Sequence, residues 1–432
     1  MSNQKLSTQP YKGTRDFYPN EMKLRNWFFG KIRETLTLAA FDEYNGPMLE
    51  SLEVYAAKSG DELAREQTYN FTDRGGRDLA IRPEMTPTVA RMVAAKMGEL
   101  NYPLKWFSIP NMYRYERPQR GRLREFWQLN VDIFGCDTFE ADLDAIESAI
   151  SVLRAFGADE SMFRVHINNR RFFNDVIAAI CGTDEEGSRK VSKVVDRRGK
   201  VTREAYEKDL TELGLSSEQI EKIDSLYTLD VKEATALCPD SLGSQELSSL
   251  FDALKKTGLD KYCMFDFGII RGLDYYTGTV FEVFDEAPEN NRAMFGGGRY
   301  DNLVGLFVKN AKVSGVGYGM GDVTLENFLV THNLVPDLYT AERKVLVTRF
   351  DDVPYEAYLA LVDELRAAGV AATVYLGNKK FGKQIDFAVK DRYSHVVIMG
   401  GDELASNQVK VKNLITREET AVNRADLGKY FN

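Results

Sequence analysis

Residues 112–135 (MYRYERPQRGRLREFWQLNVDIFG) constrain the fold more than any other part of the chain. Two runs with period-two alternation flank a loop rich in arginine and glycine, which predicts a β-hairpin. Alternate residues of the second run are apolar, and they are Trp127, Leu129, Val131 and Ile133. The residues between them are Phe126, Gln128, Asn130 and Asp132. One face of this strand therefore belongs to a core, and the other collects aromatic, amide and carboxylate groups.

The loop between the two runs is strongly basic. Residues 114–124 contain five arginines (114, 117, 120, 122 and 124) and one glutamate, Glu116. Guanidinium groups form bidentate, charge-assisted hydrogen bonds with phosphate, so the loop favours a phosphate-containing ligand. An ordinary solvated hairpin is the alternative interpretation of the same residues.

Glycine is concentrated between residues 268 and 321. Three successive glycines occur in FGGGRYDNLVG (295–305), and GVGYGMGD (315–322) has glycine at every second position. In a strand, such alternation removes the side chains from one face and leaves room for a flat ligand such as a purine. For each cluster considered alone, a turn or tight strand packing is the favoured explanation.

Composition restricts the chemistry. The net charge is −9, from 56 Lys+Arg and 65 Asp+Glu, which by itself argues against a nucleic-acid partner. The local field of the arginine loop matters more than this sum, because salt screens charges beyond about 8–10 Å. The four cysteines and three histidines are dispersed, so we expect no zinc site and no histidine-based nucleophilic mechanism. The chemistry should depend on Arg, Glu, Asp, Tyr and backbone groups.

The chain should form two domains and a linker. Apolar spacing predicts helices over 20–40 and 138–156, and a charged, glycine-poor stretch predicts a helical insertion over about 171–262. We expect residues 1–330 to form an α+β domain that contains this insertion, 331–341 a linker, and 342–432 an α/β domain with a mainly parallel sheet. GNKKFGKQ (377–384) resembles a phosphate loop, but Gln384 replaces the metal-binding hydroxyl residue.

Several short motifs stand along the chain: GTRDFYP (13–19), LAIRPEMTP (79–87), YRYERPQRGRLREFWQL (113–129), RGLDYYTGTVFE (271–282), GGGRYD (296–301) and, near the end, KKFGKQIDFA (379–388) with VKNL (411–414). Together these motifs resemble the histidyl-tRNA synthetase family of class II aminoacyl-tRNA synthetases. The resemblance implies a six- or seven-stranded antiparallel sheet with helices, a helical insertion and a C-terminal anticodon-binding domain. It also implies ATP-dependent ligation of L-histidine to tRNA(His) through histidyl-adenylate.

The resemblance further implies roles for individual residues. Arg271 and Arg114 would be catalytic. The ATP-binding residues would be Arg114, Glu116, Arg122, Phe126, Gly319 and Gly321. The histidine-binding residues would be Glu84, Met85, Thr86, Arg114, Gln128, Asp132, Arg271, Tyr275, Tyr276 and Tyr300. Magnesium is expected with ATP.

Three positions depart from the family pattern. Thr324 stands where the family has the motif-3 arginine that packs on adenine, Asp132 where glutamate is usual, and Asn130 where glycine is common. These departures favour the alternative of a non-catalytic, histidine-binding regulatory paralogue, of the kind that serves ATP phosphoribosyltransferase. The retained C-terminal segment and Arg114, Glu84 and Arg271 favour the synthetase. The resemblance implies a homodimer. We expect a cytoplasmic protein with no membrane segment, because no apolar run approaches the roughly 18 residues that a bilayer requires and the first residues lack a signal-peptide apolar stretch.

Overall fold

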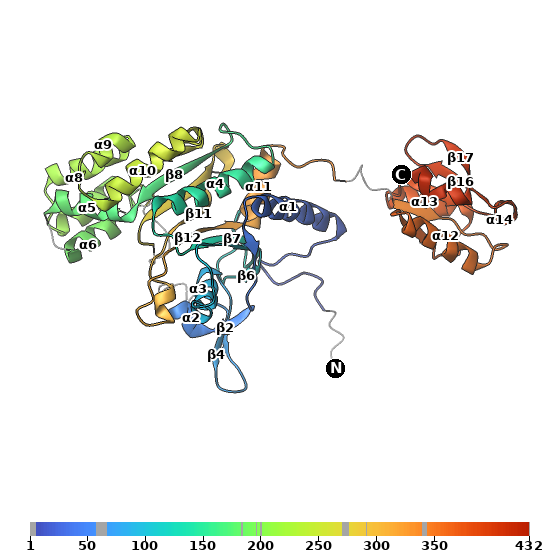
Figure 1. The fold of residues 1–432 in the computed structure, drawn as a ribbon, viewed down its shortest axis with the longest axis horizontal. Coiled ribbons are helices and arrows are strands. Elements are labelled where there is room, and N and C mark those ends of the chain that lie inside the picture. The colour runs from blue at the N-terminus through green and yellow to red at the C-terminus, as the bar shows by residue number, and fades with distance from the viewer. Residues whose placement is uncertain are drawn as a thin grey trace. The chain divides into compact units, whose positions relative to one another are not determined.

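The computed structural model describes residues 6–57, 67–182, 185–195, 197–198, 201–269, 276–290, 292–338 and 344–431. The chain divides into two compact units, Met1–Pro336 and Asp337–Asn432 (Figure 1). Within the described ranges, no helix combines the length and the apolar character needed to cross a bilayer.

A large sheet forms the centre of the first unit. In the described residues it has nine strands, in the order β1-β5-β7-β12-β11-β10-β8-β9, with β6 paired to β7. The bounds are β1 Asp42–Glu43, β5 Leu104–Ser108, β6 Asn111–Tyr113, β7 Glu125–Phe134, β8 Phe163–Asn169, β9 Cys263–Phe265, β10 Thr279–Asp285, β11 Ala293–Arg299 and β12 Gly315–Gly321. The pairing is antiparallel except at the two ends, where β1 pairs with β5 and β9 with β8 in parallel. The expected antiparallel sheet is therefore present, and two short parallel edge strands extend it.

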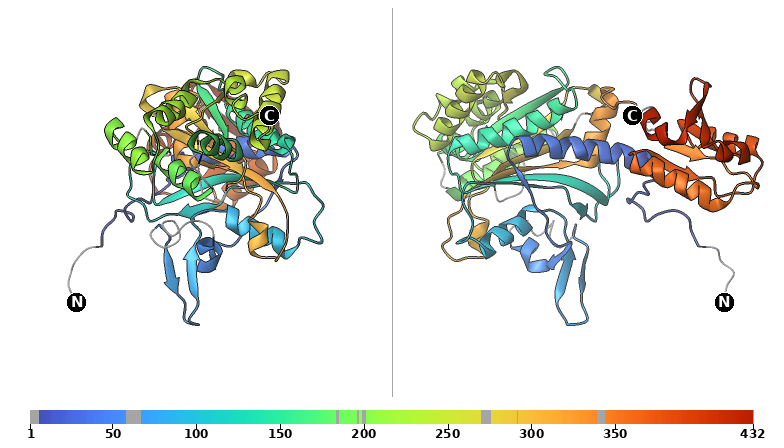
Figure 2. Two further views of the ribbon diagram at one scale, coloured as in Figure 1. Left: turned by 90° about the vertical axis from the view of Figure 1, so that its left-hand side faces the viewer. Right: turned by 45° about the vertical axis from the view of Figure 1, so that its right-hand side comes forward.

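Long helices cover one face of this sheet (Figure 2). They are α1 Pro19–Leu38 and α4 Phe139–Ala155, close to the spans expected from the sequence. Apolar residues of α1, such as Phe28 and Ile32, share one core with Leu129, Val131 and Ile133 of β7. The apolar stripe of β7 thus faces the helices, and its polar stripe is left for the opposite face.

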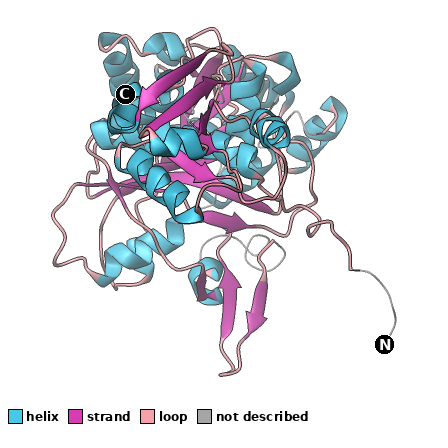
Figure 3. Cartoon of the chain, turned by 90° about the vertical axis from the view of Figure 1, so that its right-hand side faces the viewer, coloured by secondary structure: helices cyan, strands magenta, loops and turns pink. Residues whose placement is uncertain are grey.

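Smaller elements lie on that opposite face (Figure 1). A three-stranded sheet has the order β2-β4-β3, and β3 and β4 form a hairpin that projects away from the large sheet (Figure 3). The bounds are β2 Leu49–Ser51, α2 Leu52–Ala56, β3 Asn70–Thr72, β4 Asp78–Ile81 and α3 Thr86–Ala95. Val89 and Val93 of helix α3 share one hydrophobic core with Phe134 and Tyr300.

The segment predicted as a helical insertion is helical where it is described. Its helices are α5 Arg170–Cys181, α6 Glu185–Val195, α7 Arg203–Glu212, α8 Ser217–Ser225, α9 Val231–Thr235 and α10 Leu242–Lys256, with 3-10 turns at Leu226–Thr228 and Asp260–Tyr262. The Asn169 side chain caps α5 by accepting from the backbone N–H groups of Arg171 and Phe172. Gly182 ends this helix in the left-handed conformation, at φ 63°.

Three further elements complete the first unit. Helix α11, Asp322–Thr331, follows β12 directly, and 3-10 turns lie at Pro288–Asn290 (η4) and Val304–Leu306. Asp322 accepts a hydrogen bond from the backbone N–H of Trp127 at 3.0 Å and pairs with Arg15 at 2.6 Å. These contacts fix the start of α11 against β7.

The second unit is a five-stranded α/β layer with the order β14-β13-β15-β16-β17. Its bounds are β13 Lys344–Val347, α12 Tyr355–Ala367, β14 Ala371–Val374, α13 Phe381–Lys390, β15 His395–Ile398, α14 Gly401–Ala405, β16 Gln408–Asn413, β17 Glu419–Asn423, a 3-10 turn Arg424–Asp426 and α15 Leu427–Phe431. Only the β13–β14 and β13–β15 pairings are parallel, so the sheet is mixed rather than mainly parallel. Gln384 has a structural role, because its buried amide bonds the backbone of Arg349 and Lys379.

Candidate active site

The alternating glycines of β12 lie at the centre of the candidate site. Gly319 lines two adjoining cavities, with Gly321 on the wall of the larger and Gly317 on that of the smaller. A Cβ atom at Gly317 would lie 2.9 Å from Asp132 Oδ1, and one at Gly319 would lie 2.9 Å from Gln128 Cδ. Side chains at these positions would therefore displace residues of β7. The bare strand face expected from the sequence is present.

The larger cavity has a volume of about 1040 Å³. All six residues expected to contact ATP lie on its wall, and they are Arg114, Glu116, Arg122, Phe126, Gly319 and Gly321. The other wall residues include Glu282 on β10 and Thr324 at the start of α11. The hairpin and the glycine strand, about 200 residues apart in the sequence, thus meet around one space large enough for a nucleotide.

Arginine side chains of this cavity make specific contacts. Arg114 donates from Nε to the carbonyl of Pro83 at 2.8 Å, and its Cζ lies 5.4 Å from the centroid of the Phe126 ring. Arg122 pairs with Glu116 at 3.4 Å, and Arg120 donates to Asn290 Oδ1 at 3.2 Å. The Pro83 carbonyl orients the Arg114 guanidinium, whereas the other two contacts are exposed and can be exchanged for ligand oxygens.

The smaller cavity, about 220 Å³, adjoins the larger one. Six residues expected to bind histidine line it: Glu84, Thr86, Arg114, Gln128, Tyr276 and Tyr300. Arg114, Gln128, Glu282 and Gly319 belong to both cavities. Because Arg114 lies where the two spaces join, a single guanidinium faces both.

Asp132 and Met85 are not among the residues that line the two cavities, so their contacts with histidine stay predictions. Met85 is fully buried at the start of α3. Asp132 is 2 % exposed and accepts hydrogen bonds from the hydroxyl groups of Tyr300 and, at 3.3 Å, Tyr44. Burial raises the pKa of Asp132 from 3.8 to about 7, and the two tyrosine hydrogen bonds oppose that rise. Asp132 thus contacts a residue of the cavity wall, Tyr300, and its hydrogen bond fixes the Tyr300 hydroxyl.

Two of the predicted residues, Arg271 and Tyr275, lie outside the described residues. Conversely, sequence reasoning assigned no site role to Glu282 and Tyr318, which line the smaller cavity. Asn130 also lines it, on the polar strand face that the alternation places beside Gln128. Glu282 carries no such signal, because it lies within an apolar run.

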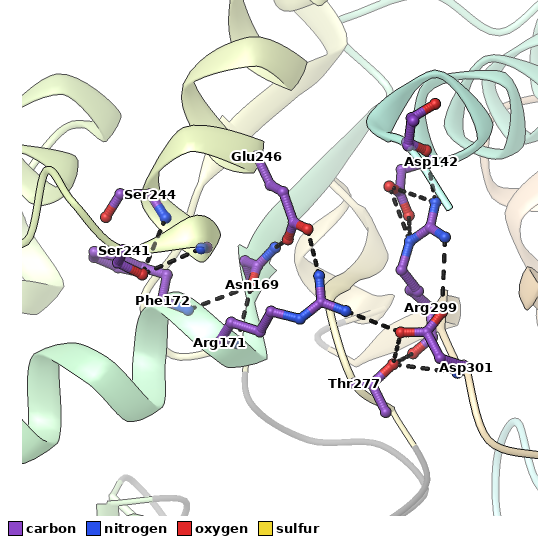
Figure 4. Close-up of polar contacts among 12 residues, drawn as sticks. Asp142, Asn169, Arg171, Phe172, Ser241, Ser244, Glu246, Thr277, Arg299 and Asp301 are labelled. Carbon is purple, nitrogen blue, oxygen red and sulfur yellow. Dashed lines mark hydrogen bonds and ion pairs between the residues drawn. The ribbon is translucent and has the colours of Figure 1, made fainter. Parts of the chain in front are cut away.

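A polar network fixes the chain next to Tyr276 (Figure 4). Thr277 donates to Asp301 at 2.7 Å, Asp301 pairs with Arg171 at 2.9 Å, and Arg171 pairs with Glu246 of α10. Asn169 also donates to Glu246, at 2.7 Å. The helical insertion is therefore connected by side chains to the residue that follows Tyr276.

Arg299 forms a second part of this network (Figure 4). It is 2 % exposed and pairs with the buried Asp142 of α4 at 2.9 Å. It also donates to the carbonyl groups of Cys136 and Thr138 at 2.9 and 2.8 Å. The guanidinium thus joins β11 to the turn that leads into α4, and its charge is compensated.

This fold and these cavities define a class II aminoacyl-tRNA synthetase: an antiparallel sheet, an arginine-rich hairpin over paired nucleotide-sized and amino-acid-sized cavities, and a separate α/β unit. Two family models match the chain, histidyl-tRNA synthetase over residues 13–322 and an anticodon binding domain over residues 344–432. The chain belongs to the histidyl-tRNA synthetase family.

Individual relatives agree with this membership. The chain is 42 % identical over 423 residues to a histidine–tRNA ligase of Leptospira biflexa, covering 97 % of this chain and 96 % of the relative. It is 40 % identical to one of Opitutus terrae, covering 96 % of each. Among solved structures, histidyl-tRNA synthetase from Nostoc sp. PCC 7120 matches with a TM-score of 0.81 and 25 % identity, covering 99 % of both chains. The expected fold class is confirmed.

Proposed function

We propose that this chain is a histidine–tRNA ligase, which joins L-histidine to tRNA(His) at the expense of ATP. The observation that carries the proposal is the pair of adjoining cavities that share Arg114, in a chain of this family. Relatives with this activity in their names match over nearly the whole length, and the anticodon-binding segment is retained. The regulatory-paralogue alternative is therefore not favoured.

The first step forms histidyl-adenylate. The histidine carboxylate attacks the α-phosphorus of ATP and pyrophosphate leaves, so no general base is needed. Arg114, between the cavities, would neutralise charge on the α-phosphate, and we assign a similar role to Arg271. Arg122 would bind the distal phosphates, Glu116 the adenine amino group, and Phe126 the ring face. Positioned cations of this kind supply most of the rate in such displacements.

The second step transfers the histidyl group. The 3′-terminal hydroxyl of the tRNA attacks the acyl carbonyl, and AMP leaves. We propose that residues 344–432 read the anticodon, as the family description of this segment suggests. The enzyme would act in the cytoplasm as a homodimer, and sedimentation of the purified protein tests the dimer.

The smaller cavity would select the imidazole side chain. The Tyr300 hydroxyl donates to Asp132, so its lone pairs can accept from an imidazole N–H. Glu84, Thr86, Gln128 and Tyr276, which line this cavity, would hold the amino group and the ring, together with Tyr275 and with the buried Met85. A site of buried polar groups rejects ligands that leave those groups unpaired.

Magnesium fits this site as an ion carried by ATP. Among the described residues, no group of three or more acidic, histidine or cysteine side chains could hold a metal. Glu282, which lines both cavities, offers a carboxylate next to the expected phosphates. One carboxylate together with phosphate oxygens is a usual magnesium environment. The ion would neutralise the distal phosphates.

Histidine-dependent exchange of pyrophosphate into ATP tests the proposal. The purified protein should catalyse exchange with L-histidine and not with other amino acids. Arg271→Ala should lower the exchange rate by about 100-fold or more, because it removes a cation needed mainly in the transition state. Histidine binding without any exchange would refute the ligase and favour the regulatory alternative.

A further inference from the structure

One arginine of the larger cavity has no hydrogen bond or ion pair with the residues that the structure describes. Four arginines line this cavity: Arg114, Arg120, Arg122 and Arg292. The first three contact Pro83, Asn290 and Glu116, respectively. Arg292 is exposed and has no hydrogen bond or ion pair anywhere in the described part of the chain. Its guanidinium is therefore available to a ligand without the loss of an existing pair.

Arg292 lies at the end of the cavity where α11 begins. It directly precedes β11, and Thr324 of α11 donates from Oγ1 to the carbonyl of Met294 at 2.8 Å. Gly121, at the tip of the hairpin loop, also approaches here, because a Cβ atom on it would lie 3.7 Å from Thr324 Cγ2. The start of β11, the start of α11 and the loop tip thus meet around one part of the wall.

Phe126 faces the same part of the cavity. Gly321 of β12 pairs with Gln128, so the chain that continues into α11 passes beside Phe126 on β7. Thr324 cannot supply a cation there, and its hydroxyl is already bonded to the carbonyls of Met294 and Gly321. The aromatic ring provides one surface for a flat base, and a planar cation on the other side of the base would complete a stack.

We propose that Arg292 binds ATP by laying its guanidinium on the face of the adenine opposite Phe126. This inference rests on the proposed function. A guanidinium is planar, delocalised and weakly hydrated, so it stacks on an aromatic ring better than an ammonium group does. The cation thus comes from the start of β11, and Thr324 leaves space for it.

Substitution of Arg292 tests the contact. Arg292→Ala should weaken the binding of ATP by about ten-fold. The loss should appear both in the KM for ATP in the exchange assay and in the Kd for ATP measured by calorimetry. The KM for histidine should stay within about two-fold of the wild-type value. Arg292→Lys should lose nearly as much as Arg292→Ala, because lysine keeps the charge but not the plane. Wild-type affinity for ATP in Arg292→Ala would overturn the proposal.

AMP distinguishes the base from the distal phosphates. If Arg292 stacks on adenine, Arg292→Ala lowers the affinity for AMP and the affinity for ATP by the same factor. A lower affinity for ATP with an unchanged affinity for AMP would overturn the stacking assignment and would indicate that Arg292 contacts the distal phosphates. Arg74→Ala is the matched control, because Arg74 is an exposed arginine in the β3–β4 turn, outside both cavities, and should change nothing.

A double variant distinguishes loss of a nucleotide contact from loss of folding. Thr324→Arg in the Arg292→Ala background should restore much of the ATP affinity, since both positions border the same wall. No restoration, in a protein with wild-type melting temperature, would overturn the placement of Arg292. Failure of the proposed function is recognised separately, because the wild-type protein would then show no histidine-dependent exchange.

Discussion

The buried carboxyl group of Asp132 makes the stability of the first unit depend on pH. It is 2 % exposed, and burial raises its pKa from 3.8 to about 7. Between these values the folded protein holds a proton that the unfolded chain has released. The free energy of unfolding therefore falls as pH rises through this window. The stabilisation that protonated Asp132 contributes is fully present only below about pH 4.

The magnitude follows from the size of the shift. A difference of one bound proton changes the free energy of unfolding by about 1.4 kcal/mol per pH unit. Over the roughly three units between the two pKa values, the total contribution of Asp132 is about 4 kcal/mol. Asp132→Asn is neutral at every pH and should remove this slope, so the variant becomes more stable relative to the wild type as pH rises from 5 to 7.

Urea unfolding monitored by tryptophan fluorescence can measure this difference. All three tryptophans, Trp27, Trp106 and Trp127, lie in the first unit, so the signal reports on that unit alone within the full chain. Asp137→Asn replaces an exposed carboxylate nearby and should leave the slope unchanged. Equal slopes for the wild type and Asp132→Asn would refute the argument that burial keeps this carboxyl protonated between about pH 4 and pH 7.

Three further predictions concern other parts of the structure. Gly319→Ala should lower kcat/KM in exchange by roughly 100-fold while the melting temperature changes little, because the new methyl group displaces only the flexible end of Gln128. Arg299→Ala should destabilise the first unit by about 3–5 kcal/mol in urea unfolding, because it leaves Asp142 buried without its partner. Truncation after Pro336 should lower tRNA charging far more than exchange, and equal loss of both in a folded fragment would argue against an anticodon reader.

Local patterns were sufficient for the elements that surround the site. The alternation in 112–135 predicted a hairpin, and β6 and β7 are its strands. The glycines of 315–321 predicted a bare strand face, and Gly317, Gly319 and Gly321 of β12 provide it. Such periodicities succeed because strand geometry and the face that a residue occupies depend on the backbone of a few neighbours.

Edge strands were harder to predict from the sequence. β1 and β9 have two and three residues, too few for any periodicity to be recognised. In the second unit, the strand-helix-strand alternation predicted a parallel sheet, but β16 and β17 add to it in antiparallel pairing. Which strands become neighbours depends on packing and not on the pattern of either strand.

By itself, then, the sequence determined the hairpin and the long helices around the site, which strand faces are polar, and the family to which the motifs belong. Only the tertiary structure decided how the polar groups combine. Tyr300 contacts Asp132 across 168 residues, and Arg171 contacts Asp301 across 130. The same folding set Asp132 behind Tyr300 rather than on the cavity wall, and brought Arg292 to the wall near Thr324. Local periodicity carries no information about such distant pairs, because their geometry is set when separate elements pack into one core.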